Sequence, residues 1–235
     1  MKVEKRTINQ IRYTFVDNGG AAVCFMFSGA GYTYEKPLLY YSTMAMLENG
    51  YDVIHIHYSY EYGPLFKRSL SEINDTLCSD IHPVITDVLG KKQYDSILFL
   101  GKSLGTIPII HDFIRNNRYE NSKMVLLTPL LKYNDICETL MNCRQPALVA
   151  IGGNDHHFIE SKVTEIGTNP LVKVIAIPNA GHSLEIEPYN TRQSLSVMEL
   201  VMETLIDFIG ISPSRRGIET EAGGETNPHK QRRGI

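Results

Sequence analysis

The stretch S-I-L-F-L-G-K-S-L-G-T-I-P-I-I, residues 96–110, decides the fold. Its first five residues, 96–100, are largely apolar and typical of a buried strand. They run directly into Gly101-Lys102-Ser103-Leu104-Gly105, the pattern G-x-S-x-G between a strand and a helix. That pattern is typical of a sharp, strained turn that exposes its central serine, and only small residues fit two positions to either side. Ser103 is therefore the candidate nucleophile.

Two other interpretations of this turn were open. In one, Ser103 only caps the helix that follows. In the other, Gly101-Lys102-Ser103 ends a phosphate-binding loop, G-x-x-x-x-G-K-[ST]. That loop requires a glycine five residues before Gly101, where the chain has Ser96, and the residues between them form a strand-like run. The sequence thus argues against a nucleotide-hydrolysing loop.

The rest of the chain alternates β-rich runs with helix-like runs. The predicted strands are residues 21–27, 52–57, 96–100, 124–127, 147–151 and 172–177, and the predicted helices are residues 37–48, 66–89, 104–116, 157–166 and 194–209. Residues 7–16 could supply one or two antiparallel edge strands. This order predicts an α/β fold with a doubly wound, mostly parallel sheet and helices on both faces. Ligands of such sheets bind at the carboxyl ends of the strands.

Two further candidates follow the last two predicted strands. Asp155 lies just after residues 147–151, and His182 lies just after residues 172–177. A serine hydroxyl is a weak nucleophile at neutral pH unless a base removes its proton, and the base needs a third group to fix its tautomer. A serine, a carboxylate and an imidazole are therefore predicted at one edge of the sheet.

In these three motifs and in their order along the chain, residues 21–209 resemble the α/β-hydrolase superfamily. The resemblance implies that Ser103 is the nucleophile, Asp155 the orienting acid and His182 the general base. It also implies little or no cap domain, because only residues 128–146 separate the strands between which family members insert one.

The resemblance further implies an oxyanion hole. Its donors would be the backbone N–H of Ala30 or Gly31, in the loop after the first parallel strand, and the N–H of Leu104. The family often begins this loop with His-Gly, whereas this chain has Ser28-Gly29.

The acid and the neighbouring histidines had alternatives. Asp155 could be only the N-cap of helix 157–166, and Asp135, after the preceding strand, is the other candidate acid. We expect His156 and His157 to be surface or helix-start residues. His55-x-His57 lacks the additional ligands of a zinc site, so we expect neither a metal nor a cofactor.

Composition narrows the class of partner. The chain has 235 residues and a formal net charge of −3, which favours neither nucleic acid nor an anionic membrane as partner. Its first residues show no signal peptide, and four cysteines without metal-ligand spacing fit a reducing cytoplasm. We expect one domain at residues 1–210 and a disordered tail at residues 211–235, which is rich in glycine, proline and charge.

The expected function is cleavage of a small-molecule carboxylic ester or thioester through an acyl-enzyme on Ser103. A non-catalytic binding protein on the same scaffold is the alternative from another class. Peptidase or other acyl-transfer chemistry on the same three side chains is a further alternative.

Overall fold

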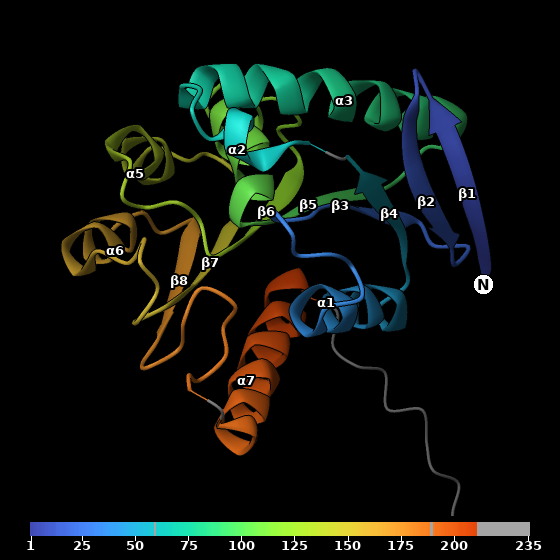
Figure 1. Ribbon diagram of the computed structural model, residues 1–235. Helices are drawn as coiled ribbons and strands as arrows, with labels where there is room; N and C mark the ends of the chain where they lie inside the picture. Colours follow the sequence, from blue (N-terminus) through green and yellow to red (C-terminus); the bar gives the residue numbers. More distant parts are fainter. Residues whose placement is uncertain (59, 189, 211–235) are drawn as a thin grey trace, which may run out of the picture.

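The computed structural model describes residues 1–58, 60–188 and 190–210. Within them a single sheet of eight strands has the order β1-β2-β4-β3-β5-β6-β7-β8 (Figure 1). The strands are β1 (Lys2–Ile8), β2 (Ile11–Asp17), β3 (Ala22–Phe27), β4 (Tyr51–His57), β5 (Ser96–Lys102), β6 (Ser122–Leu127), β7 (Ala147–Gly152) and β8 (Val172–Ile177). The strands β3 to β8 pair in parallel, and β1 and β2 form an antiparallel hairpin beside β4.

The fold class expected from the sequence is confirmed. All six strands predicted after residue 20 form, and their ends differ from the predicted ends by at most two residues. The N-terminal hairpin is longer than the predicted segment 7–16, and its turn, Asn9-Gln10, falls inside that segment. Both turn residues have positive φ, 46° and 70°. This is the geometry that joins antiparallel strands with the native twist.

Helices cover both faces of the sheet (Figure 1). On one face lie α1 (Pro37–Glu48) and α7 (Thr191–Ile209), and on the other lie α3 (Leu70–Lys91), η2 (Ile109–Ile114), α5 (Asn134–Met141) and α6 (Glu160–Ile166). Successive side chains of a strand point to opposite faces. In β3, Phe25 and Phe27 pack in the core under α3 and η2, whereas Cys24 and Met26 pack in the core over α1 and α7. The sheet is therefore buried on both sides.

The predicted helix 66–89 begins later in the structure. The backbone N–H of Glu72 donates to Ser69 Oγ, and the Glu72 carboxylate accepts from the backbone N–H of Ser69 at 2.9 Å. This capping box starts α3 at Leu70 and leaves a separate short helix, α2 (Tyr62–Leu65). Residues 66–69 are thus free of helical structure, and two of them, Phe66 and Arg68, line the cavity described below.

Three of the remaining four predicted helices differ in their starts or their internal geometry. The predicted helix 104–116 is three short segments: the 3₁₀ turn η1 (Ser103–Gly105), α4 (Thr106–Pro108) and the π-helical η2. α6 starts at Glu160 and not at residue 157, and α7 starts at Thr191 and not at residue 194. The bounds of α1 are those predicted.

The last described helix, α7, ends at Gly210, which has a left-handed φ of 72°. The predicted tail, residues 211–235, lies outside the described residues. Among the helices that the structure describes, none is both long enough and apolar enough to cross a membrane.

At the amino-terminal ends of the parallel strands, the buried carboxylate of Asp52 holds two loops together. It accepts hydrogen bonds from the backbone N–H groups of Asn18 and Gly20, at 2.8 and 3.1 Å. It also accepts from Lys92 Nζ at 2.7 Å and from the Tyr94 hydroxyl at 2.9 Å. Burial raises the pKa of Asp52, but these hydrogen bonds outweigh it and hold the pKa below its ordinary value. Asp52 thus ties the β2–β3 and α3–β5 connections together.

Asp52→Ala is therefore expected to lower the free energy of unfolding by about 3 kcal/mol at pH 7, since it leaves buried N–H donors and a lysine without their acceptor. The folded pKa lies below the unfolded one, so the contribution of Asp52 is present above pH ~4 and is lost as the pH falls through the folded value. Urea denaturation of the wild-type protein and of Asp52→Ala, at pH 7 and at pH 3, measures the difference in free energy of unfolding. The exposed Glu48→Ala control should change stability by less than about 0.5 kcal/mol, and an equal effect of the two substitutions would contradict the assignment.

Candidate active site

Ser103 stands on a strained turn at the end of β5. Its φ is +52°, in the left-handed region that a residue with a side chain rarely adopts. The Thr106 hydroxyl donates to the carbonyl of Ser103 at 2.6 Å and fixes the turn. A Cβ at Gly101 would collide with the carbonyl of Gly105, and a Cβ at Gly105 would collide with the carbonyl of Phe27. The two glycines therefore let the helical segment approach the strands, as the motif requires.

Ser103, His182 and Asp155 form one chain of hydrogen bonds. His182 Nε2 lies 2.8 Å from Ser103 Oγ, and His182 Nδ1 lies 2.8 Å from Asp155 Oδ2. The three residues follow β5, β8 and β7, whose carboxyl ends lie at one edge of the sheet. This is the arrangement in which an imidazole can take a proton from a hydroxyl while a carboxylate holds its tautomer.

The Asp155 carboxylate is buried and accepts a second hydrogen bond from its own loop. Its Oδ1 accepts from the backbone N–H of His157 at 2.9 Å. Burial raises the pKa of Asp155, but the hydrogen bonds from His182 and from the His157 N–H outweigh it, so the pKa lies below its ordinary value. The alternative that Asp155 caps helix 157–166 is wrong, because α6 begins at Glu160 and its N-cap residue is Ile159.

Asp135, the other candidate acid, lies elsewhere. It is in the first turn of α5, where its Oδ2 is 3.6 Å from both His111 Nε2 and Arg115. Among the described residues, the carboxylate that bonds to His182 is that of Asp155.

The loop after β3 lies directly beside the nucleophile. A Cβ on Gly29 would be 3.4 Å from the Cβ of Ser103. The N–H of Tyr32 donates to the carbonyl of Gly29 at 3.2 Å, which closes a tight turn in which Gly31 has a φ of +63°. Ala30 and Gly31, in the middle of this turn, line the same cavity as Leu104. The predicted oxyanion-hole residues are thus gathered around Ser103.

The cavity next to Ser103 has a volume of about 570 Å³. Apolar residues from the α2–α3 region and from the connection after β6 form part of its wall, among them Phe66, Leu70, Ile73 and Leu130. It is also lined by four cationic side chains, Lys36, Arg68, Lys102 and Lys132, and no carboxylate of the described residues lines it. The sequence pattern did not predict that these cations line the site. The one local signal was the lysine inside G-K-S-L-G.

His156 and His157 also line the cavity, together with His182. The prediction that both are surface or helix-start residues is wrong for His157, which is buried. Burial lowers the pKa of His157 to about 4, so this ring is neutral at pH 7. One ligand nitrogen from each of the three rings lies within 4.8 Å of the others, a spacing that could admit a metal ion. The surrounding lysines oppose a cation there.

A second cluster of ligand atoms joins Cys78, His82 and Asp112 on the α3 side. His82 Nε2 lies 2.8 Å from Asp112 Oδ2. Burial raises the pKa of the Cys78 thiol to about 12, so the thiol stays protonated near neutral pH and is a poor nucleophile.

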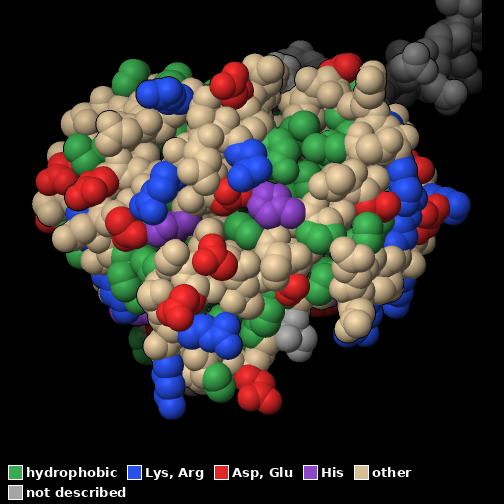
Figure 2. All heavy atoms as spheres, turned by 90° about the horizontal axis from the view of Figure 1, so that it is seen from above, with side chains coloured by type: hydrophobic (Ala, Val, Ile, Leu, Met, Phe, Trp, Pro, Cys, Tyr) green, Lys and Arg blue, Asp and Glu red, His purple; other side chains and the backbone are tan. Residues whose placement is uncertain are grey.

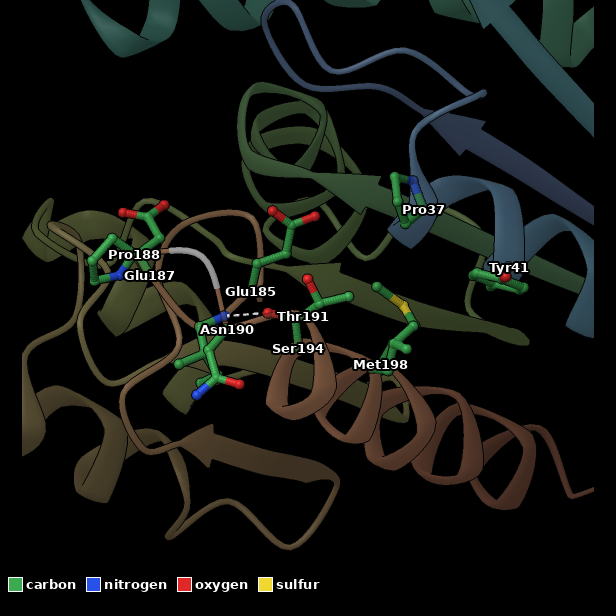
Figure 3. A pocket seen from close by; sticks show the side chains of 11 residues that line it. Pro37, Tyr41, Glu185, Glu187, Pro188, Asn190, Thr191, Ser194 and Met198 are labelled. Atoms are coloured by element: carbon green, nitrogen blue, oxygen red, sulfur yellow. Dashed lines mark hydrogen bonds between the residues drawn. The ribbon is translucent and has the colours of Figure 1, made fainter.

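A separate cavity of about 630 Å³ lies between α1, the start of α7 and the loop before α7 (Figure 3). Its residues include Tyr41, Met198 and the acidic side chains of Glu185 and Glu187. Ser103 and His182 are not among them.

The chain belongs to the alpha/beta hydrolase domain family, whose model matches residues 21–210. No curated protein sequence matches the chain. Similar solved structures include the esterase Pf2001 of Pyrococcus furiosus, with a TM-score of 0.66 and 14% identity over 89% of this chain and 91% of that one. Est1E from Butyrivibrio proteoclasticus has a TM-score of 0.64 and 12% identity over 89% and 100%. A serine hydrolase without lid from Xanthomonas campestris has a TM-score of 0.61 and 12% identity over 87% and 95%. These likenesses show the fold, and family membership supports a hydrolase.

Gly105→Ala is expected to lower the free energy of unfolding by about 2–3 kcal/mol, because the new methyl group meets rigid backbone at Phe27. Urea denaturation gives the value. Gly90→Ala in α3 is the matched control: a Cβ there meets nothing within 4 Å, and the change should stabilise by up to about 1 kcal/mol. Similar effects of the two changes would show that the turn is not tightly packed.

Proposed function

We propose that the protein is a serine hydrolase that cleaves a carboxylic ester or thioester through an acyl-enzyme on Ser103. The observation that carries this proposal is the unbroken hydrogen-bond chain from Ser103 Oγ through His182 to Asp155, beside the loop of Ala30 and Gly31. The name of one similar structure, the esterase Pf2001 of Pyrococcus furiosus, favours an ester over an amide.

In the first half of the proposed reaction, Ser103 Oγ attacks the carbonyl carbon of the ester and His182 Nε2 takes the hydroxyl proton. The carbonyl electron pair moves onto its oxygen. The backbone N–H of Ala30 or Gly31 and that of Leu104 stabilise this oxyanion. When the carbonyl re-forms, the bond to the leaving alcohol or thiol breaks, and the leaving group takes the proton from His182.

In the second half, His182 removes a proton from water, which attacks the acyl group on Ser103. The tetrahedral intermediate collapses to a carboxylic acid, and Ser103 recovers its proton. Asp155 remains a carboxylate throughout: it fixes the tautomer of His182 and stabilises the imidazolium formed in each half-reaction. Its low folded pKa is consistent with this role.

The proposal predicts hydrolysis of short-chain 4-nitrophenyl esters by the wild-type protein, with kcat lowered about 10⁴-fold or more in Ser103→Ala and in His182→Ala. Ser79→Ala, an exposed serine on α3, is the matched control and should retain full activity. The corresponding 4-nitroanilides test peptidase chemistry. Equal turnover by wild type and Ser103→Ala would exclude the proposed nucleophile, and folded wild-type protein that cleaves no ester would favour a binding protein.

The acid is tested by comparing two Asp→Asn variants. Asp155→Asn should lower kcat about 10³–10⁴-fold with little loss of stability, because the amide oxygen still accepts from the His157 N–H but cannot support the imidazolium. Asp135→Asn should change kcat by less than about threefold. Measurements of kcat and of the melting temperature of both variants show which aspartate is the acid. A large loss of kcat in Asp135→Asn alone would identify Asp135, on α5, as the acid.

A further inference from the structure

The cavity beside Ser103 differs in charge from the rest of the protein. The whole chain has a net charge of −3, and on the face covered by α3 acidic and basic side chains are interspersed (Figure 2). Within residues 1–58, 60–188 and 190–210, the charged side chains that line this cavity are all basic: Lys36, Arg68, Lys102 and Lys132. The cavity beside α7 carries Glu185 and Glu187 instead. A general excess of basic residues therefore does not explain the four cations.

Among the described residues, these four cations also lack the carboxylate partners that some other cations of the protein have. Lys91 and Lys92, at the far end of α3, are held by carboxylates at 2.7 Å. Within the part of the chain that the structure describes, no carboxylate forms an ion pair with any of the four cavity cations. Their positive charge is thus left available to whatever enters the cavity.

Lys102 is the most informative of the four, because only 3% of its surface is exposed. Its side chain passes over Gly29, where a Cβ would lie 2.9 Å from Lys102 Cδ. Its Nζ then reaches 4.7 Å from the centroid of the Tyr32 ring. The exposed Lys36 places its own Nζ 5.2 Å from the same centroid. Two ammonium groups therefore lie near the ring of Tyr32, which lines the same cavity as Ser103.

A buried ammonium group without a counter-ion destabilises a fold. The carboxylate that raises the pKa of Lys102 by charge attraction is that of Asp155. This carboxylate already accepts hydrogen bonds from His182 and from the His157 N–H. The ring of Tyr32 compensates only in part, through a cation–π contact. An anion supplied by the substrate would complete the site. Lys102 lines the same cavity as Ser103, so such an anion would be bound in the cavity of the nucleophile.

Building on the proposed hydrolysis, we propose that the substrate is an ester or thioester that carries a carboxylate or phosphate group, bound by Lys102 inside the cavity and by Lys36 at its rim. Arg68 and Lys132 attract the same anion to the cavity from the exposed connections before α3 and after β6.

Protonation of Lys102 adds a pH dependence. Burial lowers the pKa of Lys102 to about 8. A lysine is cationic below its pKa, so its attraction for an anion is present at pH 7 and declines as the pH rises through about 8. The charged and titratable side chains around Lys102 come from the loops at this end of the sheet: Lys36 and Tyr32 before α1, Arg68 before α3, Lys132 after β6, Asp155, His156 and His157 after β7, and His182 after β8. The carboxylate of Glu185 acts on the Tyr32 hydroxyl.

The test compares esters that differ only in charge. Mono-4-nitrophenyl adipate and its neutral methyl ester place the charge in the acyl group, and 4-acetoxybenzoate and its methyl ester place it in the leaving group. Phenyl acetate with and without a 4-phosphate distinguishes phosphate from carboxylate. In at least one pair the anionic ester should have a kcat/KM at least tenfold higher. A ratio near one in all pairs would overturn the inference while leaving the proposed hydrolysis intact.

Variants assign the effect to Lys102. In Lys102→Met the ratio of kcat/KM values, anionic over neutral, should fall about tenfold. Lys173→Met removes the same charge from an exposed position at the start of β8, at the end of the sheet away from the carboxyl ends of the strands. It should leave the ratio unchanged. The wild-type ratio should decline between pH 7 and pH 9, whereas that of Lys102→Arg, which stays charged, should not. Equal ratios in Lys102→Met and Lys173→Met would contradict the role of Lys102.

Thermal melts separate this inference from the proposed function, because they need no turnover. Without ligand, Lys102→Met should melt a few degrees above wild type, since the buried charge is gone. Adipate or inorganic phosphate should raise the melting temperature of wild type more than that of Lys102→Met. If no ester is hydrolysed but these shifts occur, the proposed function fails and the anion site stands. If neither anion shifts wild type, the anion site fails.

Discussion

The close approach of backbone to backbone at residues 101–105 is the constraint on which the site depends. The carbonyl of Phe27 occupies the place of a Cβ on residue 105, and the carbonyl of Gly105 occupies that of a Cβ on residue 101. With glycine at both positions, the segment after β5 can fold back over β3. The strain is concentrated at Ser103, which takes a positive φ. As a result the nucleophile and the loop containing Ala30 and Gly31 become neighbours, although about seventy residues separate them in the chain.

The other half of the site depends on a second close approach. β7 and β8 pair in parallel, with Gly152 opposite Ile177, so their following loops start level with each other. A Cβ at Gly152 would collide with the carbonyl of Ala180, and this packing holds the loop of His182 against that of Asp155. The N–H of His157 then fixes the carboxylate from its own loop. Backbone geometry, more than side-chain choice, therefore sets the distances between the three polar groups.

The features that the sequence could predict are those with local signals. Apolar runs predicted the six parallel strands, and G-K-S-L-G predicted the turn at Ser103. The start of α3 was also readable, since Ser69 and Glu72 form the pattern of a capping box, yet the predicted helix ran through it. The turn at Asn9-Gln10 lacks the glycine that usually marks such hairpins. The π-helical geometry of η2 has no comparable local signature.

The charge of the cavity could not be predicted, because it arises from tertiary structure. Lys36, Arg68 and Lys132 belong to three separate connections. In the sequence, each of these side chains looks like an ordinary solvated charge. Only the fold brings them to the mouth of one cavity with Lys102 inside it. The burial of His157 likewise follows from the packing of the loop after β7 and not from its neighbours in the chain. Specificity is thus less visible in the sequence than the candidate catalytic groups.

Reaction with a fluorophosphonate tests the central claim most directly, because the phosphorus centre resembles the tetrahedral intermediate and the adduct is stable. Intact-mass and peptide-mass measurements on the folded protein should show one adduct, located on Ser103. Its formation should be slowed by orders of magnitude in His182→Ala, because the base that activates the hydroxyl is gone. Folded wild-type protein that forms no adduct, or an adduct on another residue, would contradict the account.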